Sequence, residues 1–253
     1  MSAEATARVP GARSNRSWYP SGLLVLGSVL LLGWVTLDVV LTGPWYRADI
    51  AIADWVDTVD LRGKTVPNAI LWLLAQTGGR GAVLVVIGLL TLYVMRERRV
   101  WQPMLRVAVA LALLTVVVYA LKLGLGRTAP GFGSSILYAD GLSYPSGHSA
   151  NAVLWWGVAV WLVRSYAMQP WLITSCTVLA VAAPVVTTVS MLLLNYHWLT
   201  DVVAGLALGV VLLRVLQLLF STRLGEWGNA AGQARAGGRG RPRELVARPG
   251  APG

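Results

Sequence analysis

The sequence predicts an all-α membrane protein, a bundle of six transmembrane helices. Of its 253 residues, 56% are apolar and only 13% are charged, whereas roughly 25% of residues are charged in a soluble domain. Apolar runs close to the ~20 residues that a helix needs to cross a bilayer recur along the chain. Six such runs stand out, at residues 21–43, 76–95, 103–122, 148–165, 171–194 and 198–220.

The first run is longer than the roughly 7–15 apolar residues of a signal peptide, and further spans follow it, so it predicts a permanent helix. It contains one carboxylate, Asp38, near its end. Residues 44–66 are too polar to cross. Apolar side chains are interleaved with aspartates there, and this pattern predicts an amphipathic helix on the outer membrane surface. The apolar side chains are Ile50, Ile52, Trp55, Val56 and Val59.

The remaining apolar runs differ in how clearly they predict a transmembrane helix. The run at 76–95 has the shortest uninterrupted apolar core, because the Gly-Gly-Arg-Gly stretch at 78–81 interrupts it. The run at 171–194 holds the single cysteine, Cys176, so no intramolecular disulfide can form. The connection between the third and fourth runs, residues 128–144, is either a lid or a plain connection.

The distribution of arginine predicts that both termini are cytoplasmic, because cytoplasmic connections are enriched in arginine and lysine. Arginines occur in the N-terminal tail, after residue 95, at the end of the fourth run and around the end of the sixth. The connection at 44–66 holds four aspartates against two arginines and one lysine. The sequence therefore predicts a multi-pass plasma-membrane protein whose two histidines, His148 and His197, lie on the extracytoplasmic side.

Three parts are predicted along the chain. These are a cytoplasmic tail at residues 1–20, the helical domain at 21–220 and a basic, disordered cytoplasmic tail at 221–253. The last segment has almost no large apolar residues, so it cannot bury a core. The net charge is +10, but the excess lies in tails and cytoplasmic connections, where membrane topology accounts for it. Membrane lipids, and not nucleic acid, are the predicted surroundings.

Three polar stretches fall at the predicted outer ends of spans. The first contains Lys122 and Arg127 around two glycines. Glycines allow close backbone approach, and two cations beside such a turn can bind an anion. Cations at span ends also extend toward headgroups without a further role, so this stretch alone leaves both interpretations open.

The second stretch, Pro-Ser-Gly-His at 145–148, directly precedes the fourth run. Ser146 is a typical helix N-cap, and free N–H groups at a helix start form a cradle for phosphate. His148 can exchange a proton with a bound group. A plain N-cap explains Ser146 but does not explain the histidine.

The third stretch places His197 four residues before Asp201, a spacing that puts both on one face of a helix. A carboxylate that accepts from one imidazole nitrogen fixes the tautomer and makes the other nitrogen a better nucleophile. A structural hydrogen bond would explain this pair by itself. All three stretches together predict a site that holds a nucleophile, its orienting group, an acid and anion binders.

The order of these residues resembles the type 2 phosphatidic acid phosphatase (PAP2) superfamily, which includes bacterial six-span lipid phosphatases. The resemblance covers about residues 45–215. It implies a PAP2-type bundle, a lipid phosphate or polyprenyl (pyro)phosphate substrate, a phosphohistidine intermediate and no metal or other cofactor. His197 would be the nucleophile, Asp201 its orienting group and His148 the acid that protonates the leaving group. The phosphoryl oxygens would be bound by Lys122, Ser146 and Gly147.

Two positions depart from the family pattern. The pattern has arginine at positions 129 and 191, where this chain has Ala129 and Met191. Both arginines would contact the phosphate, and such charge stabilisation is often the largest catalytic term. Arg127 is the candidate to replace one of them as a phosphate ligand, and Arg80 is a weaker candidate for the other.

Three alternatives remain beside a lipid phosphatase. The missing arginines favour a catalytically weak protein that binds lipid phosphates. Six spans and a carboxylate inside the first, Asp38, allow a small transporter. His148, His197 and Asp201 are suitable zinc ligands, although the nearby Lys122 would repel the metal. Neither the lipid nor the oligomeric state follows from the sequence.

Overall fold

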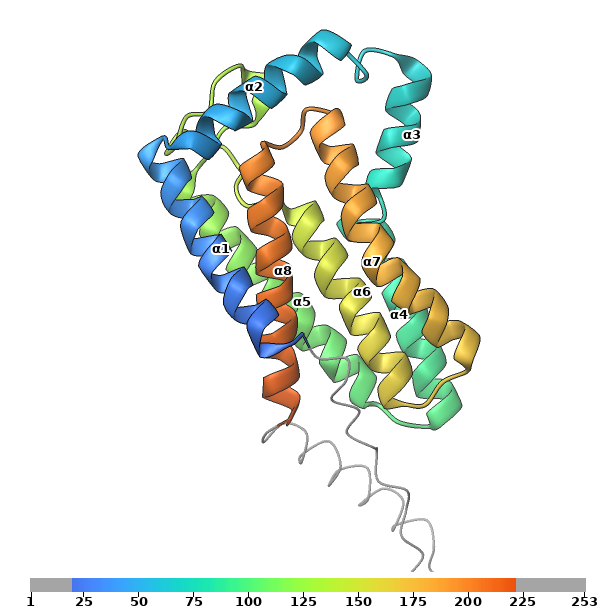
Figure 1. Cartoon of the computed structure of the whole chain (residues 1–253). Helices are drawn as coiled ribbons and strands as arrows, with labels where there is room; N and C mark the ends of the chain where they lie inside the picture. The colour runs from blue at the N-terminus through green and yellow to red at the C-terminus, as the bar shows by residue number, and fades with distance from the viewer. Residues whose placement is uncertain (1–19, 222–253) are drawn as a thin grey trace, which may run out of the picture. The chain divides into compact units, whose positions relative to one another are not determined.

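The computed structural model describes residues 20–221, in which every regular element is a helix, so the predicted all-α class is confirmed (Figure 1). Residues 20–217 belong to one compact unit, and the bundle described below lies within it apart from residues 218–221. In chain order the elements are α1 (Gly22–Leu41), α2 (Pro44–Val59), α3 (Thr65–Ala75), α4 (Arg80–Arg98), α5 (Gln102–Leu125), the short 3₁₀ helix η2 (Pro130–Phe132), α6 (Gly147–Ser165), α7 (Pro170–Leu193) and α8 (Leu199–Ser221). The tails predicted at 1–20 and 221–253 lie outside the described residues, apart from their boundary positions, and stay predictions.

Four helices in the described part are long and apolar enough to cross a membrane, namely α1, α5, α7 and α8. Helices α3 and α4 pass the same test as a pair that is bent by 42°. Helix α6 does not pass, because its first turns carry His148 and Asn151 and three tryptophans follow. The chain is thus a multi-pass membrane protein with four or five spans by this measure, against the six that were expected.

The helix expected at residues 76–95 is built differently from the prediction. Helix α4 begins only at Arg80, and a separate helix with no counterpart among the predicted elements, α3, precedes it. The chain passes between them through Gly78, so close to α6 that an added Cβ would lie 2.5 Å from the carbonyl oxygen of His148. The glycine-rich stretch at 78–81 is therefore a break between two helices, and it touches the start of α6.

The amphipathic helix expected within residues 44–66 is present as α2. Its buried side chains, Asp49, Ala53 and Val56, are spaced four and three residues apart and so share one face. Trp55 lies on another face and is 58% exposed. Helix α2 contacts α1 and α7 and lies across the ends of both helices (Figure 1).

Asp38, the carboxylate within the first span, holds the start of α2. Its side chain is buried and accepts hydrogen bonds from the backbone N–H groups of Tyr46, at 2.9 Å, and Trp45, at 3.4 Å. Such N–H groups have no partner within their own helix. The burial of Asp38, which motivated the transporter alternative, thus has a structural explanation.

Helix α6 forms the core of the bundle and packs against α4, α5 and α7. Its side chains Leu154, Val158 and Leu162 have no exposed surface. Helix α8 approaches α6 closely, since an added Cβ on Gly157 would lie 2.4 Å from the side chain of Leu213. Small residues permit this approach between membrane helices, and the result is a fixed relation between the first turns of α6 and α8.

Candidate active site

The two histidines of the chain meet at one end of the bundle. His148 lies in the first turn of α6, and His197 lies in the corner between α7 and α8. Their ring centres are 6.4 Å apart, and the ring planes are inclined by 61°. Both side chains are partly exposed, so a ligand can reach them. The structure therefore brings together the two residues that the sequence analysis expected to share a site.

The Pro-Ser-Gly-His segment is held against α8 by its backbone. The N–H of Ser146 donates to the carbonyl oxygen of Asp201 at 2.9 Å, and an added Cβ on Gly205 would lie 2.4 Å from the Ser146 carbonyl oxygen. The Ser146 hydroxyl accepts from the N–H of Ser149 at 3.4 Å and so acts as the predicted N-cap. The first N–H groups of α6 are left without partners in their own helix.

Lys122 lies beside this segment, in the last turn of α5. Its Cε is 3.9 Å from the place that a Cβ on Gly147 would take, and its ammonium donates to the carbonyl oxygen of Leu142. Helix α5 ends through Gly126, whose φ of +51° is a left-handed conformation that glycine adopts readily. The first polar stretch is thus a helix end that places a lysine next to the start of α6.

His197 and Asp201 are neighbours, but for a different reason from the one expected. His197 precedes α8, which begins at Leu199, so the two do not share a helical face. Asp201, in the first turn, reaches back to the chain before the helix. Its Oδ2 accepts from the N–H of Trp198 at 3.1 Å and lies 3.4 Å from His197 Nδ1. This return of an acidic side chain to the N–H ahead of a helix is half of a capping box.

Ser143, which was not among the predicted site residues, contacts both members of this pair. Its hydroxyl donates to Asp201 Oδ2 and lies 3.4 Å from His197 Nδ1. Ser143 belongs to the connection between α5 and α6, and its N–H donates to the carbonyl oxygen of Arg127 at 3.0 Å. This connection therefore supplies a hydroxyl to the site.

Arg127 is not exposed as a phosphate ligand would be. It is fully buried, and its guanidinium donates to protein acceptors on every side. Nη1 donates to Asp201 Oδ1 and to the Thr200 hydroxyl, each at 2.7 Å, Nη2 to Asp49 at 2.7 Å, and Nε to Ser135 at 2.8 Å. The structure places Arg127 behind Asp201, as its ion-pair partner.

Asp49 completes this buried cluster and was not predicted as a site residue. Its carboxylate accepts from Arg127 and from both the N–H, at 2.8 Å, and the hydroxyl of Thr200. Burial raises the pKa of the Asp49 carboxyl above its ordinary value, while the positive charge of Arg127 opposes the rise. The sequence held a signal, because Asp49 stands on the same helical face as Ala53 and Val56.

The positions that depart from the family pattern differ in their surroundings. Met191 is buried in a cluster with Ala75, Leu194 and Val202, an environment that would not accept an arginine. Ala129 is partly exposed and precedes η2. Arg80, at the start of α4, lies over the ring of Tyr119 at 5.4 Å, and its charge acts on Lys122.

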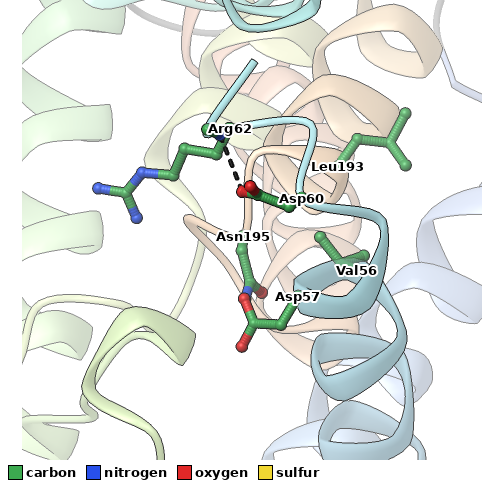
Figure 2. A pocket seen from close by; sticks show the side chains of 7 residues that line it. Val56, Asp57, Asp60, Arg62, Leu193 and Asn195 are labelled. Atoms are coloured by element: carbon green, nitrogen blue, oxygen red, sulfur yellow. Dashed lines mark hydrogen bonds between the residues drawn. The ribbon is translucent and has the colours of Figure 1, made fainter.

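A pocket of about 360 Å³ at the end of α2 is lined by none of the predicted site residues. Figure 2 shows Asp57 and Asn195 side by side in it and Arg62 pointing away. The side-chain amide of Asn195 donates to the Asp57 carboxylate at 2.6 Å. Within residues 20–221 no three His, Cys, Asp or Glu side chains are grouped as a metal ligand set.

Comparisons with known proteins agree with this architecture. The family model described as the PAP2 superfamily matches residues 103–224, a range that contains both histidines. The fold is similar to the crystal structure of a transmembrane PAP2-type phosphatidylglycerolphosphate phosphatase from Bacillus subtilis. The TM-score is 0.59 and the identity 23%, over 79% of this chain and 94% of that chain. No curated protein matches the chain.

Proposed function

We propose that the chain, whose residues 103–224 match the PAP2 superfamily model, is a membrane phosphatase of that superfamily and hydrolyses a lipid phosphate or an isoprenyl pyrophosphate through a phosphohistidine intermediate. One observation carries the proposal: His148 and His197 face one another across 6.4 Å, with Asp201 beside His197. A phosphoryl group between the rings would contact a nucleophile on one side and a proton donor on the other.

In the first step, Nε2 of His197 attacks phosphorus and the bond to the leaving oxygen breaks. Protonated His148 gives its proton to that oxygen as a general acid. Asp201 accepts a hydrogen bond from Nδ1–H of His197, which fixes the tautomer with the lone pair on Nε2. In the second step, water attacks the phosphohistidine and gives a proton to His148, so that inorganic phosphate leaves and both histidines return to their starting states.

The phosphoryl oxygens would be bound by Lys122, by the Ser146 hydroxyl and by the Gly147 N–H at the start of α6. The Ser146 oxygen accepts from Ser149 and still has its proton to donate. Helix N-termini favour anions, because their N–H groups and dipole point at the ligand. Arg80 would add a second cation, since its charge lies within electrostatic reach of Lys122.

The reaction would take place at the extracytoplasmic face of the plasma membrane, with both termini cytoplasmic. Arginine enrichment supports this orientation, because Arg96, Arg98 and Arg164 lie at the ends of α4 and α6 opposite to the histidine end. In this arrangement α6 is a sixth span, since a helix surrounded by other helices need not be apolar enough to face lipid. The substrate headgroup would then enter from the outer leaflet.

A phosphate-release assay over phosphatidic acid, phosphatidylglycerol phosphate and undecaprenyl pyrophosphate tests the proposal with purified protein in detergent. The wild type and an Asp54→Asn control, changed on the exposed side of α2, should release phosphate from at least one lipid. His197→Ala should release none while keeping its Tm. A folded wild type without turnover on any lipid would refute hydrolysis. Lipid phosphate binding that survives both that result and His197→Ala would establish the weak-binding alternative.

A further inference from the structure

One guanidinium joins two buried carboxylates from opposite ends of the sequence. The side chains of Arg127, Asp49 and Asp201 have no exposed surface, and both ion pairs measure 2.7 Å. Thr200, next to Asp201 in the chain, ties two of these groups together, because its N–H and hydroxyl donate to Asp49 and its oxygen accepts from Arg127. Buried charges are stable only when they are paired and hydrogen-bonded in this way.

The two oxygens of Asp201 serve different partners. Oδ1 accepts from Arg127, whereas Oδ2 accepts from Ser143 and the Trp198 N–H and faces His197 Nδ1. A carboxylate fixed at both oxygens cannot rotate. Arg127 therefore sets the plane in which Oδ2 meets the imidazole, and Asp49 holds Arg127 in place.

We infer that Asp49 and Arg127 are positioning residues for the phosphatase reaction, which act on His197 through Asp201 and touch no substrate atom. The inference rests on the proposed function in taking His197 as the nucleophile. It also gives Arg127 a role other than the phosphate contact expected from the sequence.

The net charge of this cluster distinguishes a positioning role for Asp49 and Arg127 from a merely structural link between α2 and α8. With Asp49 present, the cluster carries two negative charges and one positive charge, so a net negative charge stands behind His197. Without the Asp49 charge, Arg127 is neutralised by Asp201 alone, and the attraction on the His197 proton weakens. The imidazole of His197 also faces His148 on α6, which in turn is acted on by Lys122 on α5, and both groups remain unchanged in this comparison.

The chain has only two histidines, so NMR of histidine-labelled protein in detergent micelles reports on each imidazole, with His148→Gln to assign the signals. Asp49→Asn should move the midpoint of the His197 titration to lower pH by roughly half a unit to one unit. Adding Arg127→Gln to Asp49→Asn removes the positive charge that neutralises Asp201, restores a net negative charge behind His197 and should return the midpoint toward the wild-type value. Asp54→Asn, on the exposed side of α2, should leave it in place.

Kinetics supply the second readout. His197 attacks only when it is neutral, so the acid limb of kcat/KM in Asp49→Asn should move to lower pH with the NMR midpoint, while KM stays near the wild-type value. A folded Asp49→Asn protein with an unmoved midpoint, or a double variant shifted further than the single one, would overturn the inference. A shifted midpoint in a protein that hydrolyses no lipid would uphold the positioning of His197 and refute the proposed function instead.

Discussion

The carbonyl oxygen of His148 lies 2.5 Å from the point that a Cβ on Gly78 would occupy. This contact joins the break between α3 and α4 to the first turn of α6. Two hydrogen bonds reinforce it. The hydroxyls of Thr77 and Thr187 are hydrogen-bonded at 2.8 Å, and the indole N–H of Trp156 donates to the Thr77 carbonyl oxygen at 2.9 Å. The α3–α4 break is therefore part of the wall behind His148.

Gly78→Ala should destabilise the protein and displace His148. The methyl group has no room, and overpacking of this kind costs about 1–3 kcal/mol. Gly81→Ala is the matched control, since nothing lies within 4 Å of its added Cβ. Thermal unfolding in detergent and phosphate release measure the two effects. Equal Tm and equal turnover in both variants would contradict the close contact.

Arg80→Ala should weaken substrate binding if Arg80 takes the place of a missing motif arginine. Loss of one hydrogen bond to a charged phosphoryl group predicts a rise in KM of about ten- to hundredfold. Arg96→Ala, an exposed arginine at the other end of α4, should have no effect. Steady-state phosphate release measures KM. An unchanged KM in folded Arg80→Ala would mean that Arg80 does not bind the substrate.

His148→Ala should slow substrates according to their leaving groups. A lost general acid costs about 10²- to 10⁴-fold where the leaving alcohol needs a proton. An aryl phosphate with a nitrophenolate leaving group needs little protonation and should lose much less. The ratio of the two rates, compared with that of the wild type, measures the effect. Equal losses on both substrates would mean that His148 binds phosphate without transferring a proton.

Tyr144 should make stability fall at alkaline pH. Its hydroxyl is buried against Thr36 at 2.6 Å, and burial raises the pKa of Tyr144 from 10.0 to about 12. The unfolded chain loses this proton first, so stability is retained below about pH 10 and falls by about 2–3 kcal/mol as pH rises toward 12. Tyr144→Phe should lack this part of the alkaline loss, whereas Tyr138→Phe, an exposed control, should keep it. Unfolding curves from pH 8 to pH 12 measure the alkaline loss of stability in both variants and in the wild type.

Structural features that depend on residues close together in the sequence were predicted well. The amphipathic helix at α2 and the N-cap at Ser146 follow from side-chain spacing and capping preference, and both are present. The separate helix α3 was missed because residues 65–75 lie between a polar connection and a glycine-rich break, and neither marks its bounds. Helix α6 falls short of a lipid-facing span because its neighbours, and not lipid, cover it.

The site residues were harder to predict because their partners are distant along the chain. The lysine and histidine motifs come together as the family pattern implies. Arg127 seemed available for phosphate only because its partner, Asp49, lies on a helix that the motifs do not include. Met191 sits in an apolar cluster formed with Ala75 of α3, a helix that the sequence did not reveal. The burial of Arg127 and that of Met191 both depend on contacts between helices, and residue spacing within a motif does not predict such contacts.

The place of Asp49 on α2 has a consequence for how a lipid gains access. Lifting this helix away would break the buried ion pair between Asp49 and Arg127, and breaking a buried ion pair costs about 3–5 kcal/mol. Helix α2 therefore stays in place and does not swing open to admit a substrate. Under the proposed function, a lipid phosphate would approach the imidazoles from the side, with its acyl chains still in the bilayer.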